Sequence, residues 1–364
     1  MIEGQVGAPK VRIDVHSLGT SDLRGLAVVA QGMSLPVSEV ATRVWRAPAI
    51  LVDQVDRDTA NHLVSILQEV GLETAVADSS QPVPTPTLYD LAVQVTDARR
   101  VGEIVKALST VLGLEPIKAY ELLATPPGSI LGSVGEASAL ALEQRLGPGA
   151  RILRSPSGQG PFDLFVEPGR PLPPPVLQRL PQVMEYEGTG YMPLGLDHQD
   201  SERLWAVLKS HAGARLIPRA LVRFEVVLSA PASPTPERIA FLQEAFGIPP
   251  AVVPRVLRAA PVSLAHDLTL DEAGHAVHRC RALGISTVRE PMYFGRAGVR
   301  VEEVKDRVEF DRTLTRLGMA PPDHLPAQVA LDLADLEARR LMAALTASGA
   351  KARFTDPVTD GEER

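Results

Sequence analysis

Hydrophobic and polar positions follow a pattern along this chain that changes period and then begins again. A short stretch with every second residue apolar is followed by segments with apolar residues three or four positions apart, then by a glycine and another short apolar stretch. Alternation of period two predicts a strand with one buried face, and the wider spacing predicts amphipathic helices. The pattern recurs roughly every 64 to 78 residues, so it predicts an array of similar small units.

The last helix of the unit has the clearest signature. Three copies share intervals of three, four and four residues, namely Ala60/Leu63/Leu67/Gly71, Ala273/Ala276/Cys280/Gly284 and Ala338/Leu341/Leu345/Gly349. These intervals place the first three members of each set on one helical face, and the glycine falls where a left-handed residue commonly ends a helix. Cys280 is therefore predicted to be a core residue, whereas His275 and His278 lie off that face.

Opening and closing strands define the number of units. The predicted opening strands are 11–15, 89–95, 162–166, 222–228 and 299–301, and the predicted closing strands are 73–77, 150–153, 214–217, 285–289 and 350–354. Together they predict five units, at residues 11–78, 88–154, 162–218, 221–290 and 296–356. Because only residues 218–221 separate the third unit from the fourth, we expect these two to pack as a rigid pair.

The second and fourth units have the most complete interiors. In the second unit, apolar residues at helical spacing predict one helix that ends at Gly113 and another after it. The fourth unit repeats this order around Gly247. In both units, the proline beyond the second predicted helix, Pro127 or Pro261, stands 14 residues after the glycine. This agreement indicates a common layout.

The third and fifth units are predicted to be degenerate. Residues 173–200 of the third unit are rich in proline and glycine, and residues 185–192 are predicted to form a loop where a second helix should lie. In the fifth unit, Pro321 and Pro322 interrupt any long middle helix. We expect both units to keep their strands and last helix while losing a middle one.

Composition narrows the classes of protein that fit this pattern. Of 364 residues, 45% are hydrophobic and 22% are charged, a normal balance for a globular protein with sizeable cores. Aromatic residues contribute only 4%, so stacking platforms for nucleic-acid bases are scarce. A formal net charge of −7 also opposes a role on nucleic acid or anionic lipid. We therefore expect no nucleic-acid partner.

The cysteine content and the N-terminal residues bear on the cellular compartment. A single cysteine excludes an internal disulfide framework and a multi-thiolate metal site. Residues 1–10 lack the apolar core of a signal peptide, and no stretch approaches the roughly 20 apolar residues of a membrane helix. We expect a cytoplasmic protein that does not insert into a membrane.

Three motifs invite a chemical interpretation, and each has a simpler structural one. The two histidines beside Cys280 lack a third ligand, so we expect no metal. The glycine-rich residues 157–160 lack the lysine of a nucleotide-binding turn and are predicted to be a linker. Asp200 or Ser201 is expected to cap the last helix of the third unit, with proton transfer by His198 as the alternative. No Gly-x-Ser-x-Gly sequence is present. We expect no catalytic residue and no cofactor.

The two tryptophans are candidate core residues or partner anchors. Trp205 is followed three positions later by a leucine in the final helix of the third unit, so we expect it to be buried. Trp45 ends the second helix of the first unit, where core packing is the favoured interpretation. The alternative is an exposed ring that anchors a partner between Arg43 and Arg46. These three residues are therefore candidate partner-binding residues.

The layout of the units resembles a known family. A strand, two helices, a short middle strand or turn, a third helix and a final strand in about 65 residues resemble the C-terminal domain of the bacterial ribosomal stalk protein. The residues that carry the resemblance in the second unit are Val105-Lys106-Ala107-Leu108, Gly113-Leu114, Lys118-Ala119, Leu122-Leu123 before Pro127, and Gly149-Ala150-Arg151-Ile152. Those in the fifth unit are Glu337-Ala338, Leu341, Leu345 and Gly349-Ala350-Lys351-Ala352.

The resemblance implies an α+β fold in which each unit layers three helices on a small antiparallel sheet and serves as a protein-docking module. In that family, basic residues on the first two helices contact translational GTPases, and the matching positions here include Lys106 and Lys118. Ser109, Ile117 and Tyr120 stand where the family usually has basic residues. The chain also lacks the family's helical dimerisation segment, so we do not expect the stalk protein itself.

These observations lead to three hypotheses of function. The first is a non-enzymatic adaptor or scaffold that docks protein partners through repeated stalk-like domains, with a GTPase or ATPase complex as the partner that family analogy suggests. The second is a structural subunit of a large cytoplasmic assembly, in which the degenerate units pack against neighbours. The third is an enzyme with a site between units that uses His198.

Overall fold

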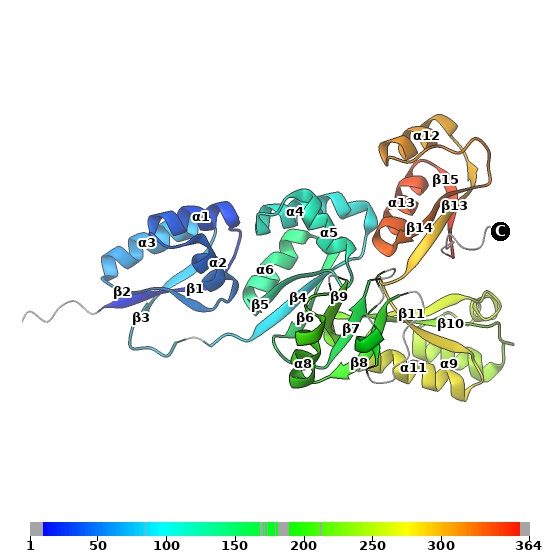
Figure 1. Ribbon diagram of the computed structural model, residues 1–364, viewed down its shortest axis with the longest axis horizontal. Coiled ribbons are helices and arrows are strands. Elements are labelled where there is room, and N and C mark those ends of the chain that lie inside the picture. Colours follow the sequence, from blue (N-terminus) through cyan, green and yellow to red (C-terminus); the bar gives the residue numbers. More distant parts are fainter. Residues whose placement is uncertain are drawn as a thin grey trace, which may run out of the picture. The chain divides into compact units, whose positions relative to one another are not determined.

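The computed structural model describes residues 10–83, 85–167, 170, 172, 174–178, 180, 189–211 and 213–356. Helices and five three-stranded antiparallel sheets in these residues give a mixed α+β fold, which confirms the predicted class (Figure 1). We number the sheets 1 to 5 along the chain. In each sheet, the strand that comes first in the sequence is central and the next two flank it.

The chain divides into two compact parts, Met1–Ser157 and Gly158–Arg364, which we call the N-terminal body and the C-terminal body. Sheets 1 and 2 belong to the first body, and sheets 3, 4 and 5 belong to the second. None of the helices in the described residues combines the length and the apolar character needed to cross a bilayer.

Sheet 1 and its helices occupy the start of the N-terminal body. The strands are β1 (Val11–Ser17), β2 (Ala49–Val55) and β3 (Glu73–Asp78), and the helices are α1 (Leu23–Gly32), α2 (Val37–Trp45) and α3 (Arg57–Glu69). The side chains of Asp22 and Asp56 accept hydrogen bonds from the backbone N–H groups of Gly25 and Thr59. These N-caps determine where α1 and α3 begin, because they satisfy backbone donors that the helix leaves unpaired. Both helices lie on the same side of the sheet (Figure 1).

Sheet 2 follows in the same body. Its strands are β4 (Leu88–Val95), β5 (Ser129–Gly135) and β6 (Ala150–Pro156), and its helices are η1 (Ala98–Arg100), α4 (Val101–Leu112), α5 (Pro116–Ala124) and α6 (Glu136–Leu146). Helix α4 ends at Gly113, whose φ of 67° lies in the left-handed region that favours glycine. The helix and its terminating residue were both predicted from the sequence.

Hydrogen bonds join sheet 1 to sheet 2 within the N-terminal body. The hydroxyl of Ser138 on α6 donates to the carbonyl oxygen of Val44 at 2.9 Å and accepts from the backbone N–H of Leu18 at 3.1 Å. Ser138 is fully buried. A second link comes from Arg145, whose guanidinium donates to the carbonyl oxygen of Ser21. Because buried polar groups need partners, these bonds specify how the two sheets meet.

Sheets 3 and 4 occupy the first part of the C-terminal body. Sheet 3 has β7 (Phe162–Val166), β8 (Tyr191–Leu196) and β9 (Ala214–Pro218), with α7 (Pro174–Leu177) and α8 (His198–Leu208). After η2 (Arg219–Leu221), sheet 4 has β10 (Phe224–Leu228), β11 (Val262–Leu268) and β12 (Thr287–Pro291), with α9 (Pro236–Phe246), α10 (Val253–Val256) and α11 (Leu270–Ala282).

The loop predicted at residues 185–192 is partly wrong. Residues 185–188 lie outside the described part of the chain, but Tyr191 and Met192 begin β8. Tyr191 is fully buried in the core, so tertiary packing places this residue in a strand despite the glycines that precede it.

A cluster of aromatic rings joins sheets 3 and 4. The ring centroids of Tyr191 and Phe224 lie 5.8 Å apart, those of Tyr191 and Phe294 lie 5.3 Å apart, and those of Phe165 and Phe294 lie 5.6 Å apart. The phenol of Tyr191 also donates to the buried carboxylate of Asp163 at 2.6 Å. Since residues of both sheets share one core, the expectation that the third and fourth predicted units pack together is confirmed.

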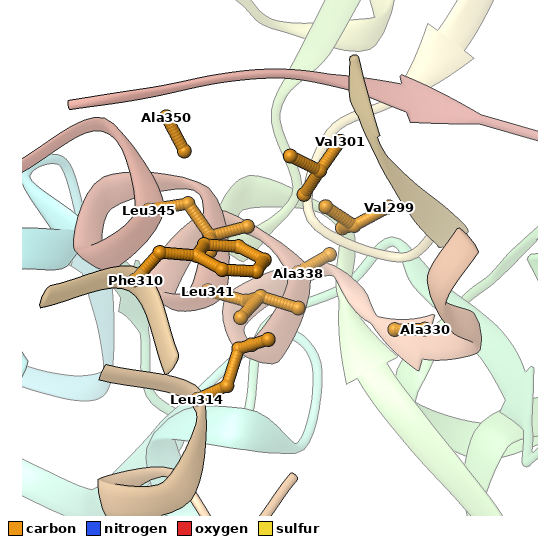
Figure 2. Close-up of a cluster of buried hydrophobic side chains, with 9 residues drawn as sticks. All are labelled: Val299, Val301, Phe310, Leu314, Ala330, Ala338, Leu341, Leu345 and Ala350. Carbon is orange, nitrogen blue, oxygen red and sulfur yellow. The ribbon is translucent and has the colours of Figure 1, made fainter. Parts of the chain in front are cut away.

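Sheet 5 ends the described chain. It consists of β13 (Arg296–Val304), β14 (Ala327–Ala334) and β15 (Ala350–Thr355), with α12 (Arg307–Arg316) and α13 (Asp335–Ala347). Figure 2 shows its core, where the ring of Phe310 on α12 lies beside Leu341 and Leu345 of α13. The segment between α12 and β14 contains no helix, as the two prolines predicted.

Candidate protein-docking face

The packing of α4 and α5 determines which of their residues face solvent. Ile104, Leu108, Ala119 and Leu123 are buried, with at most 7% of their surface exposed. The 3.6-residue period of a helix then turns Lys106, Ile117 and Lys118 outward, and all three are exposed. The two lysines predicted as partner-binding residues are therefore accessible, and we call the exposed surface of these two helices the α4–α5 face.

Charge and apolar surface occur together on the α4–α5 face. The Nζ atom of Lys118 lies 2.7 Å from a carboxylate oxygen of Glu121, an exposed pair that stabilises the helix little. The side chain of Ile117, next to Lys118 in the sequence, is 61% exposed. An exposed apolar side chain next to an amine suits a partner surface that combines carboxylates with an apolar patch.

Arg43, Trp45 and Arg46 lie at the end of α2. The guanidinium of Arg43 donates to the carbonyl oxygen of Leu51 at 2.7 Å and pairs with the carboxylate of Glu39. Trp45 is half-buried, and Arg46 is exposed. Arg43 therefore ties α2 to β2, and only Arg46 of this group is fully accessible.

The end of α2 also borders the contact between sheets 1 and 2. A methyl group at Gly135 would lie 1.7 Å from the carbonyl oxygen of Ala47, so the two backbones touch here. Nearby, the hydroxyl of Ser138 donates a hydrogen bond to the carbonyl oxygen of Val44, the residue before Trp45. The five predicted partner-binding residues thus fall into two groups, one on α4 and α5 and one beside an internal contact.

The burial predicted for Trp205 is wrong. Its side chain is 42% exposed, whereas Ser201 and Leu208 of the same helix are buried. Trp205 stands four positions after Ser201 and three before Leu208, so helical spacing places it on their side of the helix and does not account for its exposure. Helical spacing was therefore a poor guide to the burial of this residue.

The predicted N-cap of α8 is also wrong. The cap is Asp197, whose carboxylate accepts from the backbone N–H of Asp200 at 2.8 Å. Asp200 lies in the first turn, and the hydroxyl of Ser201 donates to the carbonyl oxygen of His198. An N-cap side chain accepts a hydrogen bond from the backbone N–H of a residue in the first helical turn, and Asp197 accepts one from the residue three positions later.

The histidines and the cysteine lie in three different surroundings. His198 is exposed at the start of α8, with its Nε2 atom 3.4 Å from a carboxylate oxygen of Glu202. Cys280 is fully buried, as predicted, and burial raises the pKa of its thiol. His275 and His278 are exposed on α11. Among the described residues, no group of three or more potential ligands is placed to hold a metal ion.

The sequence pattern did not predict a cavity that lies beside β12. It has a volume of about 830 Å³ and is lined by residues of α11 and β12, together with Glu225 of β10 and Asp335 of α13. Glu225 and Glu290 are direct neighbours across β10 and β12. Each glutamate interrupts the apolar residues of its strand, and this is visible in the sequence. That the two glutamates are neighbours follows only from the register of the strands, which the sequence does not reveal.

Comparison of the chain with family models, curated protein sequences and solved structures gave no match. The significance of the α4–α5 face therefore depends on the residues that resemble the stalk domain and on the exposure of Lys106, Ile117 and Lys118.

Proposed function

We propose that this chain is a non-enzymatic adaptor composed of five tandem modules, each resembling the stalk domain, that dock protein partners through exposed helix faces. The observation that carries the proposal is the recurrence of one strand order, first strand central, in all five sheets of the described chain. Several small modules on one chain raise the effective concentration for a partner with more than one docking site.

The middle strands, meaning the second strand of each sheet in chain order, support a common module. Four of these strands contain a residue with left-handed backbone near their C-terminal end, namely Gln54, Ser133, Gly195 and Asp267. Left-handed backbone is uncommon for residues other than glycine, so chance recurrence at one place in the strand is improbable. A proline also stands just before four middle strands, namely Pro48, Pro127, Pro261 and Pro326.

The α4–α5 face is the proposed docking surface of the second module. Lys106 and Lys118 occupy positions that carry partner-binding basic residues in the stalk family, and the exposed Ile117 adds apolar area. By this resemblance, a GTPase or ATPase complex is the proposed class of partner. An acidic and partly apolar surface on that partner would complement the face.

The test uses the intact chain as bait in a native lysate, with captured proteins quantified by mass spectrometry. In the double variant Lys106→Glu/Lys118→Glu, we expect loss of a specific set of proteins that the matched surface variant Lys209→Glu retains. Purified members of that set should bind the wild-type chain directly. Identical capture by both variants would contradict the role of this face.

A second candidate function is a structural subunit of a larger assembly. It is favoured by exposed apolar side chains on helices of the C-terminal body, including Trp205 at 42%, Val207 at 39% and Val308 at 67%. Size-exclusion chromatography with light scattering separates the two candidates. A monodisperse monomer favours the adaptor, whereas a large homo-oligomer favours the assembly subunit.

A further inference from the structure

The helices and strands of sheets 2 and 4 correspond position by position. Gly113 and Gly247 both end a helix with left-handed backbone, and Gly135 and Thr269 both stand at the N-cap of the last helix. The alignment contains no gap between these two points. Surfaces of the two sheets can therefore be compared residue by residue.

One surface of sheet 2, formed by α4, β5 and α6, is covered by sheet 1 and its helices. A methyl group at Gly113 would lie 2.0 Å from the Cδ2 atom of Leu23. On α6, the guanidinium of Arg145 donates to the carbonyl oxygen of Ser21. This surface is thus a contact surface within the N-terminal body.

The corresponding surface of sheet 4, formed by α9, β11 and α11, is open. Within the described chain, no atom lies within 4 Å of a methyl group placed at Gly247. Thr269 has a side chain where Gly135 leaves room for the backbone of Ala47, so a neighbour cannot approach sheet 4 in the way that sheet 1 approaches sheet 2. What remains is a cavity of about 480 Å³, which we call the β11 cavity. Small-molecule sites commonly have volumes of about 300–1,000 Å³.

Apolar side chains form most of the walls of the β11 cavity. Phe241 and Phe246 come from α9, with ring centroids 5.8 Å apart, and Leu264 and Leu268 come from β11. Phe241 and Leu264 are buried. These walls suit the apolar body of a ligand, and they favour one with an aromatic ring, because contacts between rings add to the free energy gained by burial.

Arg279 of α11 supplies hydrogen-bond donors at one end of the cavity. Its guanidinium lies over the ring of Phe241, 4.9 Å from the ring centroid. A guanidinium has five N–H donors, and the ion pair of Arg279 with Glu244 is 3.4 Å long, with the Glu244 side chain 77% exposed. Such an exposed pair is weak. Because the corresponding Arg145 binds an oxygen atom of its neighbour, a ligand oxygen that carries negative charge matches this position.

Glu272 lies toward the other end of the cavity. Its carboxylate accepts from the backbone N–H and from the hydroxyl of Thr269, both at 2.8 Å. These bonds lower the pKa of Glu272, so its charge persists at neutral pH. Arg279 stands seven positions later in the same helix, about 10 Å along the helix axis. A ligand that fits therefore has a negative group at the Arg279 end and none at the Glu272 end.

We propose that the β11 cavity binds a small apolar molecule with a single carboxylate, which pairs with Arg279 while the apolar body packs against α9 and β11. The guanidinium selects a carboxylate over an amine of the same shape, and Glu272 disfavours a second carboxylate. This inference goes beyond the docking of proteins and does not depend on the α4–α5 face.

The experiment titrates the full chain with 4-phenylbutanoate and follows the imidazole signals of the histidines by NMR. We expect saturable shifts of His266 and His275, which line the cavity, and no shift of His198 on α8. The Kd should be about 1 mM or tighter for a molecule of this size. The matched amine, 4-phenylbutylamine, should bind about tenfold more weakly or worse.

Two variants make the test specific. Arg279→Gln should weaken binding of 4-phenylbutanoate about tenfold and leave the affinity for neutral 4-phenylbutanol unchanged, which shows that the cavity is intact. Arg281→Gln removes the same charge from the same helix outside this cavity and should change neither affinity. If Arg279→Gln fails to fold, the contrast between acid and amine on the wild-type chain decides.

Four outcomes would overturn the proposal. They are absence of saturable binding, shifts of His198 as large as those of His266 and His275, equal affinity for the acid and the amine, and equal affinity of folded Arg279→Gln and wild type for 4-phenylbutanoate.

Discussion

Sheets are joined differently in the two bodies of this protein. In the N-terminal body, a buried serine on α6 bonds to the backbone of Val44 on α2 and of Leu18 just after β1. In the C-terminal body, the rings of Tyr191, Phe224 and Phe294 form a core that sheets 3 and 4 share. Hydrogen bonds contribute modestly to stability but specify geometry, whereas buried aromatic rings contribute much more free energy. Sheets with one strand order therefore associate through two kinds of contact.

The largest expected effect is at the aromatic contact. Tyr191→Ala removes a ring that touches Phe224 and Phe294 and leaves a cavity, so we expect the free energy of unfolding of the C-terminal body to fall by about 3–5 kcal/mol. Urea denaturation followed by circular dichroism measures this loss. Tyr191→Phe keeps the ring and loses only the bond to Asp163, so it should cost about 1 kcal/mol. Equal losses in both variants would show that the hydrogen bond, rather than the rings, dominates.

The hydrogen-bonded contact should respond less strongly. Ser138→Ala leaves the carbonyl of Val44 and the N–H of Leu18 without their partner, at a cost of about 1–3 kcal/mol. Faster hydrogen exchange at the Leu18 amide would report the opening of the contact. Ser109→Ala is the matched control, because the Ser109 hydroxyl is buried without a hydrogen-bond partner in the described chain. A Leu18 amide that exchanges equally slowly in both variants would contradict the assigned role of Ser138.

The two bodies should also differ in their response to pH. A carboxyl group whose pKa is raised in the folded state lowers the free energy of unfolding as the pH rises from the group's unfolded-state pKa, 4.5 for glutamate, through its folded-state pKa. Glu290→Gln removes that loss, so the variant should gain stability relative to wild type as the pH rises above 4.5. In the N-terminal body, hydrogen bonds from Arg99 lower the pKa of Asp97 to about 2, so Asp97 should remain charged throughout this range. Carboxyl chemical shifts from an NMR titration check both assignments, and a Glu290 that titrates below 4.5 would contradict the first.

The smallest effect is expected on the α4–α5 face. Lys118→Gln removes an exposed ion pair with Glu121, so the free energy of unfolding should change by no more than about 0.5 kcal/mol. Thermal unfolding measures this change. A larger loss would mean that Lys118 supports the fold, and the charge-reversal test of docking would then need a different residue.

The sequence predicted best what depends on local spacing. The strand at Phe162–Val166 has the predicted bounds, and Gly113 ends α4 as expected, because period-two alternation and a left-handed glycine are local properties. Helical spacing, which is also local, placed Cys280 in the core. Trp205 is an exception, because its spacing matches that of the buried Ser201 and Leu208 while its own side chain is exposed.

Features that depend on contacts between elements were missed. The middle strands were expected only as short strands or turns, because residues such as Gln54 and Asp267 adopt left-handed backbone and interrupt the alternation. The cavity beside β12 combines residues of β10, α11 and β12, including the paired Glu225 and Glu290, and these come from three segments of the chain. No local pattern contains that information.

The central position of each first strand has a consequence for synthesis on the ribosome. The N-terminal strand of a sheet emerges before either neighbour, and both neighbours follow before the next sheet begins, since β3 ends at Asp78 and β4 starts at Leu88. Every sheet is therefore complete before the first strand of the next one leaves the exit tunnel. A nascent chain can fold one sheet at a time, and at each stage only the most recent central strand waits for partners.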